Sequence, residues 1–193
     1  LTLAVRNSRC ALSGSSQAEA KFAASYIKRA HCDLKSLQFV VNPTNRGWTR
    51  DSGPIFVRRG PQSTVHSPRS TVQSRKSETA IVHFHFNAWA KYDDWRKDRR
   101  VPETAARILG KRLFNAEFGG KDFVIEGGGI DVNGRGTLLT TEECYLHPRI
   151  QVRNPGLTRA QYEEQFRKYL GGENVLWLLK GPAGDDTHGH IDD

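Results

Sequence analysis

Hydrophobic and polar residues follow a helical period in three parts of the chain. Residues 15–30 place apolar side chains every three or four positions against charged ones, which predicts an amphipathic helix with a serine at its cap position. Residues 158–170 predict a second helix, because Thr158 and Gln161 have the spacing of a capping box and two glycines follow. We expect a third helix over residues 101–113, with a proline in its first turn.

Short apolar runs between turn residues predict strands. They cover residues 37–41, 55–57, 79–86, 123–126, 137–140 and 175–179. We expect the last of these strands to be buried and to lead into a surface loop, and Asn133-Gly134 between apolar runs is typical of a hairpin. Strands and helices in this order indicate an α/β or α+β fold built from repeated ββαβ-like units.

Three other features limit the class of protein. Residues 60–78 are rich in Ser, Thr, Pro and Arg, which predicts a flexible surface loop. The 193 residues suffice for one domain, 1–193, or for part of a larger one, and no apolar run is long enough to span a membrane. Because the chain begins at Leu1 and contains no methionine, we expect a processed chain or a fragment, and an upstream targeting signal stays open.

The chain is basic, with a net charge of +8. Its Lys and Arg residues are dispersed and form no recognised nucleic-acid motif, so we interpret them as a solvated surface and expect no nucleic-acid or membrane partner. Three cysteines, Cys10, Cys32 and Cys144, lack CxxC spacing and are odd in number. This argues against a disulfide framework and favours a reducing compartment such as the cytoplasm.

Candidate chemistry gathers in the last ten residues, 184–193, which hold two histidines and four aspartates beside two glycines. They directly follow the last predicted strand, and loops carried on rigid strands often hold functional groups. If residues 188–192 are extended, the side chains of His188, His190 and Asp192 project to the same side, because alternate residues of a strand share a face.

Asp51 and Glu126 join this set, since each lies beside glycine and near a predicted strand, where the backbone can approach a ligand closely. Several carboxylates with a histidine suit a cationic ligand held by charge-assisted hydrogen bonds, with the imidazole of His190 moving protons. Two plainer interpretations stay open: Asp51 can cap a turn, and Glu126 can accept hydrogen bonds from the backbone of the glycine loop.

A metal site is the alternative chemistry. His188, His190 and Asp192, or His83 and His85, have the i, i+2 spacing that a strand can use for zinc. The sequence lacks paired thiolates and an HExxH helix, and the aspartates around His188 are more than a zinc site needs. We therefore favour a site without metal and interpret His83 and His85 as half-buried strand histidines.

Six short blocks occur in order along the chain. They are residues 48–54 (WTRDSGP), 86–89 (FNAW), 126–129 (EGGG), 136–144 (GTLLTTEEC), 153–155 (RNP) and 184–192 (GDDTHGHID). Together they resemble the agmatine deiminase family, also called the Porphyromonas-type peptidylarginine deiminase family. The resemblance implies an α/β propeller of the pentein type, with five blades of ββαβ units, which would be incomplete in this chain.

The resemblance also implies a reaction. Agmatine and water would give N-carbamoylputrescine and ammonia, on a route to putrescine, without a metal or an organic cofactor. Asp51 and Asp192 would hold the nitrogens of the small cationic guanidinium substrate, His190 would act as general acid and base, and Glu126 would orient His190 or support its charge. Two carboxylates match a planar cation that offers paired N–H donors.

The family nucleophile is a cysteine near the C-terminus, and this chain ends before that block. Cys144 matches a family cysteine that is not the nucleophile, while Cys10 and Cys32 fall in the first helical region. We therefore expect no nucleophile in this chain, which alone would be nearly inert, and we expect the full-length protein to be the enzyme, with a homo-oligomer left open.

Two alternative functions remain beside this one. Arg46 stands where the family usually has an acid, which leaves deimination of free or peptidyl arginine open. A catalytically inactive, basic remnant that binds anionic partners is the alternative from a different class of protein.

Overall fold

The computed structural model describes residues 2–6, 9–14, 16–29, 37–58 and 78–192. The flexible loop predicted over residues 60–78 lies outside this part, except for the exposed Glu78, and so does Cys32. Within the described part, no helix combines the length and the apolar character needed to cross a membrane.

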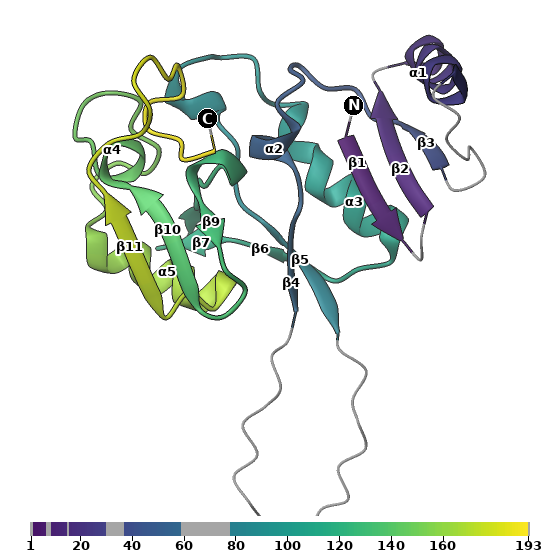
Figure 1. Ribbon diagram of the computed structural model, residues 1–193. Helices are drawn as coiled ribbons and strands as arrows, with labels where there is room; N and C mark the ends of the chain where they lie inside the picture. The colour runs from purple at the N-terminus through teal and green to yellow at the C-terminus, as the bar shows by residue number, and fades with distance from the viewer. Residues whose placement is uncertain (1, 7–8, 15, 30–36, 59–77, 193) are drawn as a thin grey trace, which may run out of the picture.

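The described elements form three ββαβ units in sequence order, which Figure 1 shows from right to left. In each unit the first two strands pair antiparallel, and the strand after the helix pairs parallel with the second strand. The units are β1 (Thr2–Arg6), β2 (Arg9–Gly14), α1 (Gln17–Arg29), β3 (Leu37–Val41); β4 (Ile55–Arg58), β5 (Thr79–His83), α3 (Val101–Leu109), β6 (Leu113–Asn115); and β9 (Asp131–Val132), β10 (Thr137–Thr141), α5 (Arg159–Leu170), β11 (Asn174–Leu178). The mixed α/β class predicted from the sequence is confirmed.

Short elements lie between these units or in the connections within them, and they carry several polar residues of interest. They are α2 (Thr49–Ser52), η2 (Ala88–Ala90), η3 (Asp98–Arg100), β7 (Glu117–Phe118), β8 (Lys121–Asp122), η4 (Gly127–Gly129) and α4 (Glu142–Tyr145). The stretch before β4 contains one helical turn, α2.

The helix predicted over residues 101–113 is too long. α3 ends at Leu109, because Gly110 adopts φ 59° and its N–H donates to two carbonyls of the last turn. Leu113 then begins β6 and lies opposite Ile81 of β5 in a parallel pair. α5, by contrast, has the predicted capping box and ends at a left-handed glycine, Gly171.

Two strand predictions in the middle of the chain need correction. β5 ends at His83 rather than at residue 86, and residues 123–126 form no strand but a single bridge between His85 and Val124. His83 is buried and His85 partly buried, and neither belongs to a group of three potential metal ligands in the described part of the chain.

β11 and the N-terminal segment also differ from expectation. Leu176 and Leu178 of β11 are 50% and 48% exposed, so this apolar run is a half-exposed strand rather than a buried one. Cys10, expected with the first helix, lies on β2.

The main core packs around β10 and α5 and supports the polar residues described below. Its fully or nearly fully buried members include Phe84, Phe123, Ile125, Leu138, Tyr145, Tyr162 and Phe166. Ile125 directly precedes Glu126, and the Tyr145 hydroxyl lies 3.3 Å from both the N–H and the carbonyl oxygen of Glu126. The core therefore fixes the backbone from which the Glu126 carboxylate projects.

Candidate active site

The four side chains singled out in the sequence as a candidate site come together around the imidazole of His190. Its Nδ1 lies 3.7 Å from Asp51 Oδ1 and 3.8 Å from Asp192 Oδ1, while its Nε2 lies 3.6 Å from Glu126 Oε2. Asp51 belongs to α2, Glu126 precedes η4, and His190 and Asp192 follow β11 near the C-terminal end in Figure 1. Three carboxylates from distant parts of the sequence therefore surround one histidine.

The loop that carries His190 is tightly folded and not extended. His188 and Gly189 adopt φ angles of 65° and 99°. The Asp185 carboxylate accepts hydrogen bonds from Thr187 and from the N–H groups of Gly189 and His190. Burial alone would raise the pKa of Asp185, but these hydrogen bonds lower it, so an ionised Asp185 closes the loop.

The expectation that His188, His190 and Asp192 face the same side is therefore wrong for His188. Its Nδ1 lies 3.7 Å from Glu143 Oε1, and its ring packs edge-on against His147 with 4.8 Å between centroids. The zinc set suggested by the i, i+2 spacing is not assembled.

Because residue 128 is a glycine, the side chains of Asp51, His190 and Asp192 can approach one another closely. A Cβ there would lie 2.4 Å from His190 Nδ1, 2.7 Å from Asp192 Oδ1 and 2.8 Å from Asp51 Oδ1. The Gly128 N–H donates to Asp51 Oδ1 at 3.1 Å, and its carbonyl accepts from the Ile191 N–H at 3.0 Å. The backbone of η4 thus lines the site and holds both Asp51 and the C-terminal loop.

Glu126 is completely buried and is paired with an equally buried cation. Arg153 Nε lies 3.2 Å from both carboxylate oxygens, and both side chains are 0% exposed. Burial raises the pKa of Glu126, but the charges and hydrogen bonds of Arg153 and His190 outweigh it and lower the pKa overall. The side chain faces these two partners rather than the backbone of the glycine turn, so Glu126 is an ionised neighbour of His190.

Asp51 is in a different electrostatic position. Trp89 Nε1 donates to its Oδ2 at 3.0 Å and Gly128 N–H to its Oδ1, but burial is the largest influence and raises the pKa of Asp51 to about 6. The charge of His190 opposes this rise, and that of Glu126 adds to it. Asp51 therefore holds a proton more readily than an ordinary aspartate, and an added cation would favour its ionised form.

His190 itself is only 2% exposed. Burial lowers the pKa of His190, but Glu126 and then Asp51 outweigh this effect, and the pKa is raised overall. Its Nε2 makes no hydrogen bond within the described residues. An imidazolium is thus stabilised by the surrounding carboxylates in a site from which water is largely excluded.

Asp192 lies on the more open side of the site, with its side chain 32% exposed. Its Oδ2 lies 3.3 Å from Nε of Arg50, a residue whose side chain is 61% exposed. One oxygen of Asp192 therefore already faces a guanidinium group of the chain itself. An incoming guanidinium ion would compete there with a largely solvated side chain.

An aromatic cluster borders the Asp51 side. Trp89 stacks on Trp48 with 4.1 Å between ring centroids. The Arg46 guanidinium lies over Trp48 at 4.8 Å and donates two hydrogen bonds to Asp94. The positive charge of Arg46 is therefore balanced by the carboxylate of Asp94.

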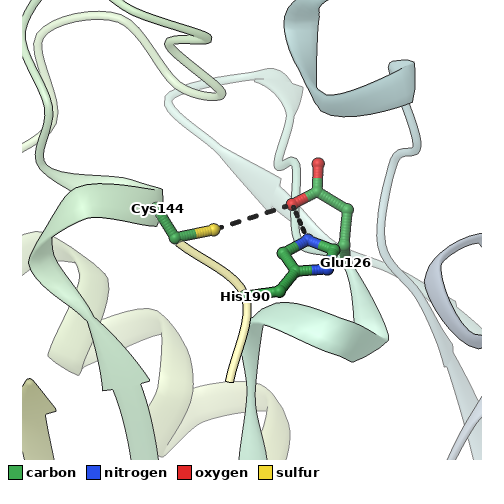
Figure 2. Close-up of side chains that lie close together, drawn as sticks. All are labelled: Glu126, Cys144 and His190. Atoms are coloured by element: carbon green, nitrogen blue, oxygen red, sulfur yellow. Dashed lines mark hydrogen bonds and ion pairs between the residues drawn. The ribbon is translucent and has the colours of Figure 1, made fainter. Parts of the chain in front are cut away.

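Glu126, Cys144 and His190 form a buried group of potential metal ligands, whose donor atoms lie within 4.8 Å of one another (Figure 2). Figure 2 shows the sulfur of Cys144 and the ring of His190 directed at the same oxygen of Glu126, with Sγ 4.0 Å from it. Burial raises the pKa of the Cys144 thiol, and Arg153 already neutralises Glu126. A metal would require the thiolate and would add positive charge beside Arg153, so this donor set does not suit one.

Two contributors to the site, Arg153 and Trp89, were not singled out as functional from the sequence. Both lie in the short motif blocks, RNP and FNAW, and this was the signal that could have found them. Their partners, Glu126 and Asp51, are distant in the sequence, so no local pattern predicts the pairing.

Three carboxylates around one histidine, on a frame of ββαβ units, form a candidate site for a cationic ligand. The sequence profile of the Porphyromonas-type peptidyl-arginine deiminase family matches residues 5–193. The chain belongs to this family, as the resemblance of its six motif blocks suggested.

Curated relatives and solved structures agree with this membership. The agmatine deiminase of Ectopseudomonas mendocina is 36% identical over 169 residues, which cover 85% of this chain and 40% of that protein. The structure of the agmatine deiminase of Enterococcus faecalis matches 94% of this chain and 43% of its own, with a TM-score of 0.70 and 28% identity. An agmatine deiminase of C. jejuni, solved with substrate bound, matches 94% of this chain and 46% of its own, with a TM-score of 0.66 and 27% identity. The chain thus spans about 40% of the length of the curated relatives it matches.

Proposed function

We propose that the protein to which this chain belongs hydrolyses a guanidinium group, converting agmatine and water to N-carbamoylputrescine and ammonia for putrescine synthesis. The observation that carries the proposal is the position of His190 Nδ1, 3.7 Å from Asp51 Oδ1 and 3.8 Å from Asp192 Oδ1. Two carboxylates beside an acid–base imidazole suit a planar cation that offers N–H groups to the oxygens and a leaving nitrogen to the ring.

In this proposal each residue has a distinct role. Asp51 and Asp192 bind the guanidinium group and keep it protonated, which keeps its carbon electrophilic. A cysteine thiolate attacks that carbon, His190 gives a proton to the departing ammonia, and His190 then takes a proton from the water that releases the product from sulfur. Glu126 stabilises the imidazolium form of His190.

Cys144 is not the nucleophile of this proposal. It is 2% exposed, and burial raises the pKa of its thiol well above the usual value, so the reactive thiolate is strongly disfavoured. We assign the nucleophile to a cysteine beyond residues 1–193, and we expect the same additional sequence to complete a five-bladed pentein propeller. A working thiol also favours a reducing compartment such as the cytoplasm.

Arginine and peptidylarginine are the alternative substrates, and Arg46 is the residue that raised them. Its guanidinium is paired with Asp94 and lies over the rings of Trp48 and Tyr92, at 4.8 and 4.6 Å. A cation that is already matched has little charge left to recruit a substrate carboxylate, which favours agmatine.

Two measurements test the proposal. Titration calorimetry of this chain with agmatine should give one binding site that Asp51→Asn removes, whereas Asp131→Asn, a change at an exposed carboxylate on β9, leaves it intact. Equal binding by Asp51→Asn would contradict the assigned pocket.

Product formation should separate the chain from the full-length protein. We expect the full-length protein to release ammonia from agmatine faster than from arginine, and the 193-residue chain to release almost none. Turnover by the chain alone would show that the nucleophile is assigned wrongly, and a full-length protein without turnover would favour the inactive binding remnant.

A further inference from the structure

We infer that Arg153 is a positioning residue, which holds Glu126 as a carboxylate and ties it to the loop that carries His190. The catalytic consequence rests on the proposed function, but the contacts and the protonation states do not. Arg153 touches none of the groups that would bind the substrate, so it would act only through Glu126 and His190.

The Arg153 guanidinium connects two separate parts of the site. Its Nε faces both Glu126 oxygens at 3.2 Å, its Nη2 donates to the Thr187 carbonyl at 2.5 Å, and its Nη1 donates to the Gln151 carbonyl at 2.9 Å. Thr187 lies in the loop closed by Asp185, three residues before His190. One buried cation thus fixes the carboxylate and the histidine loop relative to each other.

The charge of Arg153 matters as much as its geometry. A carboxylate with no exposed surface and no cation beside it would keep its proton, because burial penalises the ionised form. Glu126 would then offer His190 a neutral partner at 3.6 Å in place of an anion.

Arg153 also repels the His190 imidazolium directly, so the two effects oppose each other. Glu126 lies 3.6 Å from the ring, and it raises the pKa of His190 more than the charge of Arg153 lowers it. Asp51 and Asp192, the other carboxylates that face the ring, make no hydrogen bond or ion pair with Arg153 among the described residues, and the neighbouring Cys144 is a neutral thiol because burial raises its pKa. Loss of Arg153 should therefore lower the affinity of His190 for its proton.

The test compares two variants of nearly equal length and shape, Arg153→Met and Arg153→Lys, in this chain without substrate. Nitrogen-15 spectra of labelled histidine follow the titration of His190, whose signal is assigned by its absence in His190→Gln, and carbon-13 spectra of labelled glutamate follow Glu126. We expect a protonated Glu126 near neutral pH and a downward shift of the His190 midpoint in Arg153→Met. In Arg153→Lys the ammonium should keep Glu126 ionised and most of the shift should disappear.

Arg167 supplies a matched control, because its Nε also lies 3.2 Å from a carboxylate, that of Glu173, but in an exposed pair. Arg167→Met should leave the His190 titration unchanged. If Arg153→Met does not fold, Glu126→Gln removes the same negative charge and should lower the His190 midpoint likewise. The inference is overturned if Glu126 stays ionised in Arg153→Met, if the His190 midpoint stays or rises in Arg153→Met or Glu126→Gln, or if Lys shifts it as far as Met. Because no turnover is measured, these outcomes are independent of whether the protein proves to be a deiminase.

Discussion

The two carboxylates that face opposite nitrogens of His190 differ in a way that burial alone does not explain. Glu126 is 0% exposed and its pKa is lowered, whereas Asp51, whose side chain is 8% exposed, has a pKa raised to about 6. The difference is Arg153, which neutralises Glu126, while within the described residues Asp51 has only His190 as a cationic partner. A buried acid keeps its charge where a permanent cation faces it.

The site therefore has a completed side, around Glu126, and an incomplete side, around Asp51 and Asp192. On the Glu126 side every charge is matched by the chain itself, and the groups are closed to solvent. On the incomplete side, Asp51 and Asp192 both face His190, whose charge depends on pH, and Asp192 also faces the solvent-exposed Arg50. The incomplete side gains most from an external cation, which is the physical basis for placing a guanidinium ion there.

The largest expected effect comes from breaking the completed side. Arg153→Met should lower the free energy of unfolding by about 3–5 kcal/mol, because it leaves an unpaired buried acid, whereas Arg153→Met combined with Glu126→Leu should recover much of that loss. Urea unfolding followed by circular dichroism measures both. If Arg153→Met alone were as stable as the wild type, the Arg153–Glu126 pair would not be buried in solution.

The completed side should also make the chain sensitive to acid. Because the pKa of Glu126 is lowered in the folded state, its contribution is fully present above the ordinary value of 4.5 and is lost as the pH falls through the lower folded value. In Arg153→Met, the free energy of unfolding should therefore lose less on acidification than in the wild type, which urea unfolding at a series of pH values measures.

The next largest effect should come from filling the space between the two sides. Gly128→Ala places a methyl group within 2.8 Å of Asp51, Asp192 and His190, so these groups must move apart. We expect a loss of about 1–3 kcal/mol of stability, the usual cost of overpacking, and no detectable agmatine binding. Gly47→Ala is the control, because nothing lies within 4 Å of its new Cβ; equal agmatine affinity in the two variants would contradict the geometry.

Local signals predicted much of the frame. The helix ending at Gly171, the strand at 37–41 and the hairpin around Asn133-Gly134 are confirmed, because each depends on propensity, capping or turn chemistry within a few residues. The end of α3 was missed because the predicted helix, 101–113, runs through Gly110, which adopts the left-handed conformation of a helix cap.

Four residues of the site were predictable from the sequence, but their arrangement and their partners Arg153 and Trp89 were not. Asp51, Glu126, His190 and Asp192 stood out by residue type and by neighbouring glycines, and they do converge. The folded loop of His188 was missed because its closure depends on Asp185 accepting several backbone bonds. The opposite pKa shifts of Asp51 and Glu126 also depend on contacts between residues far apart in the sequence, which no spacing rule contains.

The incomplete side should respond to pH when it binds a cation. Asp51 must be ionised to hold a guanidinium group, so agmatine affinity should rise with pH by up to about tenfold per unit below the Asp51 pKa and less steeply above it; that pKa is about 6. Deprotonation of His190 removes a competing cation and acts in the same direction. Calorimetry between pH 5 and 8, a range of about one to two units on either side of that value, measures the slope, and affinity that falls with rising pH would contradict this assignment.

The smallest expected effect concerns Trp89, the one side chain that donates a hydrogen bond to Asp51 among the residues that the structure describes. Trp89→Phe keeps an aromatic ring against Trp48 but removes the Nε1–H that donates to Asp51 Oδ2 at 3.0 Å. A hydrogen bond to the ionised acid lowers its pKa, so its loss should move the pH midpoint for agmatine binding upward and weaken binding at pH 7 by about two- to tenfold, or roughly 0.5–1.5 kcal/mol. Trp177→Phe removes the same kind of bond, from Nε1 to Glu163 at 2.9 Å, away from the site and should leave the midpoint unchanged. A midpoint that stays in place in Trp89→Phe would mean that burial and the neighbouring charges set the protonation of Asp51 without this donor.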